Sequence, residues 1–153
     1  MAPDFEFLYD KMQHYCSYQE RCILDVQTKL RSWKVQEQVM DKIIRKLLSE
    51  GYIDEERFAR LFAGGKFRIK KWGKNKIFAE LARRRIPDLY IQMALQEIED
   101  DEYLNALQEI LTQKDSLLKE DNLQKRKHKL LQYALSKGYD QALIFRALEG
   151  LIK

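Results

Sequence analysis

Residues 65 to 77, with the sequence GKFRIKKWGKNKI, carry a dense group of positive charges. Three of the lysines stand four residues apart and would share one face of a helix. A row of cations of this kind suits an array of phosphates or carboxylates. We identify the basic residues of this stretch as candidate contacts to an anionic partner, the alternative being an ordinary solvated face: Lys66, Arg68, Lys70, Lys71, Lys74 and Lys76.

Two further basic clusters follow. Arg83, Arg84 and Arg85 end the next expected helix, where at least one of them complements the negative end of the helix dipole. Residues 66 to 85 hold nine Lys or Arg against one acid, in a chain whose net charge is only +4. This asymmetry favours an anionic partner for one face. The third cluster, which we call the secondary cluster, comprises Lys125, Arg126, Lys127 and Lys129. The three clusters either form one track along the array or are scattered over its surface.

Two aromatic residues, Phe67 and Trp72, stand among the first group of cations. Aromatic rings in a basic groove can stack on nucleic-acid bases. Trp72, however, continues the helical spacing of Phe58, Phe62 and Ile69, so we favour packing over stacking for it. Gly73 is interpreted as permitting a tight turn into the next helix.

The sequence carries no recognisable catalytic motif. It lacks a glycine-rich phosphate loop, a His-Glu-x-x-His motif and a nucleophile elbow, and its only histidines are His14 and His128. Cys16 and Cys22 lack the paired spacing of a zinc site and are expected to be reduced thiols. The acidic residues between 97 and 102 fit the capping of a helix N-terminus better than a metal site. We predict that the protein is not an enzyme and needs no cofactor or metal.

The composition predicts an all-α protein. The 153 residues include only six Gly and two Pro, and 34% are charged. The first ten residues lack the basic segment and apolar run of a signal peptide. The longest stretch without Asp, Glu, Lys or Arg is eight residues, which is too short to span a membrane. We therefore expect a cytoplasmic monomer with no membrane contact.

Three segments repeat one apolar spacing. Counted from the anchor residues Val35, Ile86 and Tyr139, apolar side chains recur at positions +5, +8, +9 and +12. An apolar residue of the preceding helix stands five positions before each anchor. Each segment therefore predicts a helix, a short turn and a second helix. The expected inward residues include Met40, Ile43, Ile44, Ile91, Leu95, Ile144 and Leu148.

Stacked units of this kind predict an elongated, curved array of tandem three-helix repeats that resemble helix-turn-helix units. We expect an N-terminal arm or short helix at 1–16, repeats at 17–65 and 66–118, and a third repeat at 119–153 that is truncated after its second helix. Gly64 and Gly65 fall inside an expected helix, which should be continuous or slightly bent, a hinge being the alternative. The expected helices are 5–15, 17–32, 36–50, 54–70, 74–84, 88–98, 101–113, 120–137 and 140–151.

The segment GYIDEERFARLF, followed by basic residues and WGKNKIFAEL, resembles the RecX family of bacterial recombination regulators. The sequence departs from the family pattern at Glu55, where Asp is commoner, and at Arg85, where a glycine suited to a left-handed turn often stands. The matching positions are Gly51, Asp54, Arg57, Phe58, Ala59, Gly73, Ile77, Glu80, Leu81 and Ile86.

The resemblance implies a non-enzymatic modulator that binds the RecA filament on single-stranded DNA, lodges in its helical groove, and inhibits ATP hydrolysis, strand exchange and filament growth. It also implies tandem three-helix repeats, which the apolar spacing predicts independently. From the residues alone, two other classes remain open. One is a helical module that binds DNA directly. The other is a helical adaptor that binds its partner through apolar surface residues.

Overall fold

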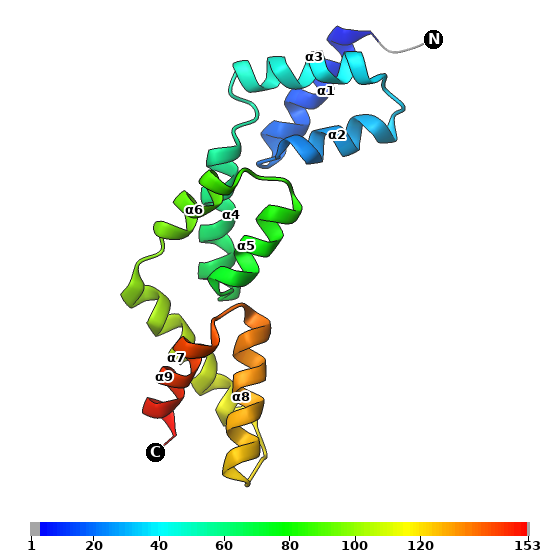
Figure 1. Cartoon of the computed structure of the whole chain (residues 1–153). Helices are drawn as coiled ribbons and strands as arrows, with labels where there is room; N and C mark the ends of the chain where they lie inside the picture. The colour runs from blue at the N-terminus through cyan, green and yellow to red at the C-terminus, as the bar shows by residue number, and fades with distance from the viewer. Residues whose placement is uncertain (1–3, 153) are drawn as a thin grey trace.

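The computed structural model describes residues 4 to 152, and every regular element among these residues is an α-helix. The chain forms an elongated array with its two ends far apart (Figure 1). No helix in the described range is long and apolar enough to cross a membrane. The predicted all-α repeat architecture is confirmed, with helices α1 (Phe5–Tyr18), α2 (Ile23–Ser32), α3 (Glu37–Ser49), α4 (Glu55–Lys70), α5 (Lys74–Arg83), α6 (Asp88–Gln96), α7 (Asp100–Leu117), α8 (Leu123–Lys137) and α9 (Gln141–Leu151).

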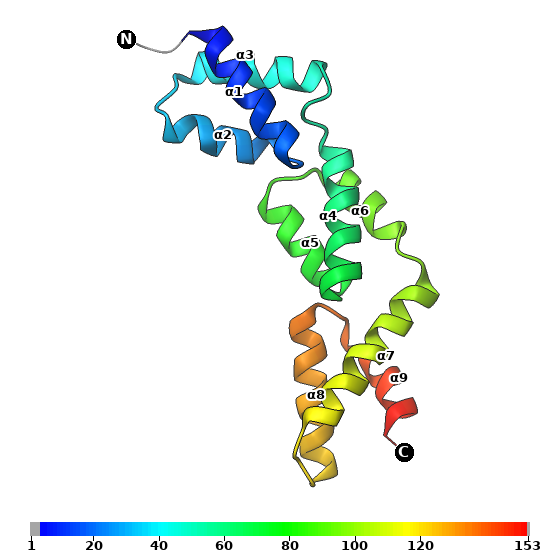
Figure 2. The ribbon, with the colours of Figure 1, turned by 180° about the vertical axis from the view of Figure 1, so that it is seen from behind.

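The helices pack in threes, as α1–α3, α4–α6 and α7–α9, which we call the first, second and third units (Figures 1 and 2). The predicted boundary between residues 65 and 66 falls inside α4, so the packed units are offset by one helix from the predicted ones. Each anchor lies between the second and third helices of a packed unit. The repeats predicted from the apolar spacing instead began at that second helix, so they placed the first helix of each following unit at the end of the repeat before it. The third unit therefore has three helices and is not truncated.

The anchors end the second helix of each unit through the same backbone geometry. The N–H of each anchor donates to the carbonyl five positions earlier, over 3.1 Å at Val35 and Ile86 and 3.2 Å at Tyr139. This pattern is the Schellman motif, which requires a left-handed residue just before the anchor. That residue has a φ of 59° at Lys34, 61° at Arg85 and 104° at Gly138. The left-handed turn therefore forms at Arg85 without a glycine.

Apolar side chains form two cores, one inside the first unit and one continuous through the second and third. Cys22, which precedes α2, joins the second of these cores. The seven residues expected to point inward are all buried. Helix α4 is continuous through Gly64 and Gly65, as predicted. The predicted stripe along α4 is wrong at Ile69, whose side chain is 81% exposed because it lies on the outer face of the helix.

Leu95 on α6 provides a test of the core assignment. Truncating this buried side chain by the substitution Leu95→Ala should lower the free energy of unfolding by about 2 to 5 kcal/mol, because it removes apolar contacts and leaves a cavity. The matched control is Leu89→Ala on the same helix, where the side chain is 65% exposed and the change should stay within about 0.5 kcal/mol. Urea unfolding measures both, and equal losses would contradict the assigned face.

Candidate binding site for an anionic partner

Cationic and aromatic side chains alternate where α4 and α5 pack together. The Arg84 guanidinium lies 5.3 Å from the centroid of the Phe62 ring. Lys66 Nζ lies 5.5 Å from the Phe62 centroid and 5.0 Å from that of Trp72. Lys76 Nζ lies 4.5 Å from the Trp72 centroid. We call these five residues the cation–aromatic ladder.

Local helix geometry positions the ladder. Phe62 and Lys66 stand one turn apart on α4, so they project from the same face. Lys71 ends α4 in a left-handed conformation, with a φ of 59°, and this turn carries Trp72 back over the helix. The Trp72 N–H donates to the Lys66 carbonyl over 3.2 Å, and the Phe62 and Trp72 rings meet edge to face with centroids 6.2 Å apart. Trp72 is half-buried against the core, so the predicted packing role is confirmed.

The rings favour positions of the ladder cations over their faces. A cation over an aromatic face gains about 0.5 to 1 kcal/mol at an exposed site and loses rotamer freedom on binding the ring. The ring contacts therefore favour a row of cations over independent, fully solvated side chains. Phe67, the other aromatic residue of this stretch, is buried against Tyr103 and is not accessible for stacking on a base.

Lys137 at the end of α8 extends the positive surface beyond Lys76. Its Nζ donates to the Lys70 carbonyl over 2.8 Å. Burial, together with the charges of Lys76 and Lys70, lowers the pKa of Lys137. Repulsion among these three lysines would be relieved by an anionic group placed beside them. The sequence alone did not indicate Lys137, because only the fold brings α8 to the start of α5.

The second and third units meet backbone to backbone at this point. The Gly73 N–H donates to the Lys137 carbonyl over 2.7 Å, and the Asn75 N–H donates to the Gly138 carbonyl over 3.0 Å. A Cβ atom on Gly73 would lie 2.3 Å from the carbonyl carbon of Gly138. The prediction that Gly73 serves a tight turn is wrong, since its φ is −77° and any residue can adopt that value. Glycine is required here by close approach.

This junction also closes the N-terminus of α5. Helix N-termini commonly bind phosphate through free N–H groups. Here the end of α8 accepts two of those N–H groups, and the Lys74 N–H donates to the Tyr103 hydroxyl over 2.8 Å. Burial raises the pKa of Tyr103 to about 12, so the hydroxyl stays protonated at neutral pH. An anion must therefore be bound by side chains at this site.

Three of the predicted contacts are instead used to hold the third unit. Arg68 pairs with Glu102 at 3.5 Å, and Lys71 pairs with Glu109 at 3.5 Å. Lys74 Nζ lies 5.0 Å from the centroid of the Tyr103 ring. All three partners belong to α7. These cations join the second unit to the third, whereas Lys66, Lys70 and Lys76 have no acidic partner within 4.0 Å among the described residues.

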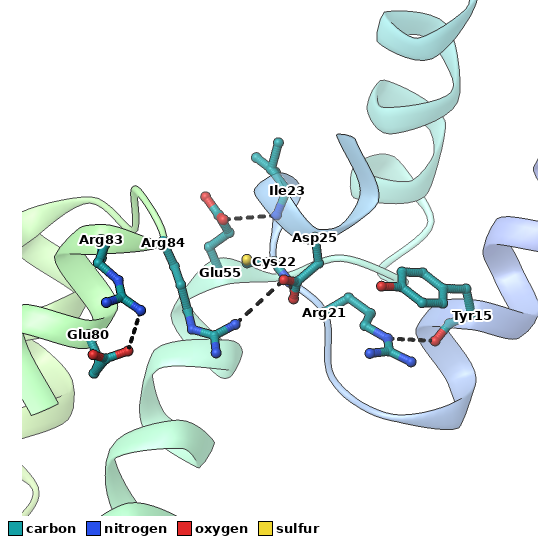
Figure 3. A network of polar contacts seen from close by, with 9 residues as sticks. All are labelled: Tyr15, Arg21, Cys22, Ile23, Asp25, Glu55, Glu80, Arg83 and Arg84. Atoms are coloured by element: carbon teal, nitrogen blue, oxygen red, sulfur yellow. Dashed lines mark hydrogen bonds and ion pairs between the residues drawn. The ribbon is translucent and has the colours of Figure 1, made fainter. Parts of the chain in front are cut away.

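The three arginines before Ile86 do not form one patch. Arg83 pairs with Glu80 on its own helix at 3.5 Å, and Arg85 is exposed at the left-handed turn. Arg84 reaches across to the first unit and pairs with Asp25 at 3.5 Å (Figure 3). Arg84 is thus both the last member of the ladder and part of the junction with the first unit.

Polar contacts also hold the junction between the first and second units. Glu55 on α4 accepts the Ile23 N–H over 3.0 Å, at the start of α2 (Figure 3). Burial raises the pKa of Glu55. Arg57 pairs with Glu20 across the same junction. Arg57 therefore takes part in the contact between the first and second units.

The secondary cluster lies on α8, away from the ladder. Arg126 donates to both oxygens of Asp115 over 2.6 Å, and Lys129 pairs with Glu120 at 3.1 Å. Lys125 is exposed, and Lys127 is half-buried. The predicted clusters are therefore dispersed over the second and third units, and only part of the first cluster joins Arg84 in one row.

The Asp115 pair makes stability depend on pH. The Arg126 guanidinium holds the pKa of Asp115 below its usual range. A lowered folded-state pKa gives stability that is present above the unfolded pKa and is lost as the pH falls through the folded one. We expect Asp115→Asn to lower the free energy of unfolding at pH 7, and the difference from wild type to shrink below about pH 4. Urea unfolding at both pH values checks this, and a pH-independent difference would contradict it.

The acidic residues near 100 lie at the start of a helix, and both cysteines lie in the protein interior. Glu99 is the N-cap residue of α7 but makes no capping hydrogen bond with its side chain, and Asp100, Asp101 and Glu102 occupy the first turn, where negative charge favours the helix N-terminus. Across residues 4 to 152, no three His, Cys, Asp or Glu side chains are placed to hold a metal ion together. Cys16 and Cys22 are free and buried, and burial raises the pKa of each to about 11.

Fold and site together define a helical-repeat protein with a cationic row on its second unit. Models of the RecX second and third three-helix domains match residues 54–95 and 100–148, which cover more than half of the chain. The chain therefore belongs to the RecX family of regulatory proteins, and the resemblance seen in GYIDEERFARLF is confirmed. The matched domains also coincide with the second and third units.

Named relatives agree with this assignment. Regulatory protein RecX from Bacillus cereus (strain AH820) and from Bacillus thuringiensis (strain Al Hakam) are each 33% identical over 138 residues, or 90% of this chain. The match spans 51% of either relative, so the chain covers about half of their length.

Two crystal structures share the fold. RecX from Lactobacillus salivarius has a TM-score of 0.87 and 24% identity, over 99% of this chain and 98% of that one. A second regulatory protein RecX has a TM-score of 0.88 and 20% identity, over 95% of this chain and 73% of that one.

Proposed function

We propose that the chain is a non-enzymatic cytoplasmic regulator that binds the RecA filament on single-stranded DNA and inhibits ATP hydrolysis, strand exchange and filament growth. The observation that carries this proposal is the cation–aromatic ladder on a protein of the RecX family. A filament that contains DNA offers a long, negatively charged groove. The ladder, with Lys70 and Lys137 beside it, offers an extended row of positive charge on an elongated helical array.

Two features support binding through side chains at this surface. Lys66, Lys70 and Lys76 have no acidic partner within the described residues, so binding an anionic groove would cost no internal ion pair. The rings of Phe62 and Trp72 hold the ladder cations in place, which lowers the entropy lost on binding. In this account the filament phosphates or acidic side chains pair with the lysines, and the length of the array lets it lie along the groove.

Co-sedimentation tests the proposal. RecA filaments assembled on single-stranded DNA are pelleted with the protein, beside the same DNA without RecA. We expect recovery in the filament pellet and much weaker recovery with bare DNA. The recovered fraction should fall as salt rises, because cations that bind phosphate release counterions. Equal recovery with bare DNA would favour a module that binds DNA directly, and no recovery with filaments would refute the proposal.

A further inference from the structure

The outer face of α4 carries exposed apolar side chains beside the cation–aromatic ladder. Leu61 is 53% exposed and Ile69 is 81% exposed, although both are large and apolar. Gly65 stands midway between them at four-residue spacing, so the three residues share one face of the helix. The buried residues Ala63 and Phe67 lie on the opposite side. This face is in the middle of the array, away from both ends of the molecule (Figure 1).

Gly65 leaves a hollow between the two apolar side chains. A Cβ atom added at Gly65 would meet nothing within 4 Å. An enclosed apolar cavity of about 150 Å³ is large enough to bind benzene. The hollow on α4 has a volume of about 210 Å³, so it has room for one large apolar side chain of a partner. Its lining residues are Leu61, Phe62, Gly65, Lys66, Ile69 and Lys70.

The charge around this hollow is positive. Its lining includes Lys66 and Lys70 and, among the described residues, no acidic side chain. Both lysines also lack an acidic partner within 4.0 Å in the part of the chain that the structure describes. An apolar side chain that enters the hollow therefore matches it best when acidic residues flank that side chain in the partner.

Acidic side chains in the adjoining hollows are each accompanied by arginines. Glu20 and Asp25 line a hollow toward the first unit, and each of them already pairs with an arginine. On the other flank of α4, Glu97 lines a third hollow together with Arg60 and Arg68. The positive charge of Lys66 and Lys70 thus remains available to a partner.

An apolar side chain fits the hollow better than a nucleic-acid base does. Bases of single strands bind largely by stacking on aromatic rings. Phe62, whose ring lines the hollow, already stacks on Phe58 with centroids 5.9 Å apart. Lys66 and Arg84 place their charged groups 5.5 Å and 5.3 Å from the centroid of the same ring. Phosphates can pair with lysines, but they gain nothing from exposed aliphatic side chains.

We propose that this hollow binds an acidic peptide segment through one large apolar side chain, such as Phe or Leu. That side chain fills the space above Gly65, between Leu61 and Ile69, and acidic residues on either side of it pair with Lys66 and Lys70. A buried apolar anchor commonly supplies much of the affinity of an interface. The inference rests on the proposed function and makes it more specific, because the protein of the filament, and not its DNA, supplies the segment that binds here.

Two synthetic peptides test this recognition without RecA or DNA. Both carry a fluorescent label and the same run of Asp and Glu residues, and they differ only in one central residue, which is Phe in the first and Ser in the second. Fluorescence anisotropy should show that wild type binds the Phe peptide about tenfold more tightly or better, because only Phe fills the hollow. Equal affinities would mean that charge alone accounts for binding, which overturns the proposal.

Gly65→Leu fills the hollow without changing a charge. This variant should bind the Phe peptide only as tightly as the Ser peptide, while its affinity for the Ser peptide stays that of wild type. The matched control is Gly150→Leu in α9, another helical glycine where an added Cβ would meet nothing within 4 Å, and it should bind both peptides like wild type. Circular dichroism checks that both variants are folded, as expected because Leu favours a helix more than Gly does. A folded Gly65→Leu that keeps the preference for Phe overturns the proposal.

Co-sedimentation of the same variants separates this inference from the proposed function. Recovery of Gly65→Leu with RecA filaments on single-stranded DNA should fall several-fold below that of wild type and Gly150→Leu, whereas recovery with bare DNA should be the same for all three. If Gly65→Leu pellets with filaments like wild type, the inference is overturned and the proposed function stands. If wild type itself fails to pellet, the proposed function is refuted, and the peptide affinities alone support or overturn the inference.

Discussion

Replacing Gly73 with alanine is expected to lower the free energy of unfolding by about 2 to 4 kcal/mol, since the added methyl group overpacks a closed junction and separates paired backbone groups. The new Cβ would lie 2.3 Å from the Gly138 carbonyl carbon and 2.4 Å from its oxygen. These are backbone atoms, which cannot rotate away. To relieve the clash, α8 must move from α5, and the hydrogen bonds from Gly73 and Asn75 are then strained or lost.

Gly65 provides the matched control for this prediction. It lies inside α4, and a Cβ there would meet nothing within 4 Å. Gly65→Ala should therefore raise the free energy of unfolding by up to about 1 kcal/mol through helix propensity alone. Urea unfolding followed by circular dichroism measures both variants. If Gly73→Ala were as stable as wild type, the second and third units would not be joined by this backbone contact.

The triple variant Lys66→Glu, Lys70→Glu and Lys76→Glu is expected to lose inhibition of strand exchange. Each substitution removes an attraction to the filament and adds a like-charge repulsion that costs several kcal/mol. Because 1.4 kcal/mol corresponds to a tenfold change, the concentration for half-inhibition should rise by more than about 100-fold. A strand-exchange titration against RecA measures this shift. Lys71 and Lys74 are left intact, since they hold α7 and their reversal would disturb the fold.

A second triple variant controls for net charge. Lys42→Glu, Arg45→Glu and Lys119→Glu make the same total change at exposed residues away from the ladder. This control should inhibit within a few-fold of wild type. Both variants should keep their helical circular-dichroism signal, because partly exposed cations contribute little to folding. If the variant with Glu at positions 66, 70 and 76 is folded and inhibits at the wild-type concentration, apolar contacts elsewhere must carry the interaction.

Regular spacing explains which parts of the fold were predictable from sequence. Apolar side chains at +5, +8, +9 and +12 indicated the second and third helices of each unit, because the helical period imposes them. The residue five positions before each anchor proved to be the acceptor of the Schellman bond. The predicted units were offset by one helix. The repeated spacing describes only two helices of each unit, and it does not show whether the helix before or the helix after that pair packs against them.

The site was less predictable, since it depends on contacts between distant segments. The basic stretch indicated an anionic partner, but the sequence could not separate Lys66 and Lys76, held over aromatic rings, from Lys71 and Lys74, turned toward α7. Lys137 joins the site through a contact with Lys70, 67 residues away in sequence. Close approach of two backbones likewise decides the role of Gly73, and no local pattern encodes it.

Lysine acetylation footprinting of the wild-type protein tests most directly whether the ladder contacts the filament. Two samples are acetylated briefly: the free protein, and the protein pelleted with RecA filaments on single-stranded DNA. Mass spectrometry then quantifies the modification at each lysine. We expect modification of Lys66, Lys70 and Lys76 to fall several-fold in the pelleted sample, while Lys42 and Lys119 react as in the free protein. Unchanged reactivity of Lys66, Lys70 and Lys76 in protein recovered with the filament would contradict the account.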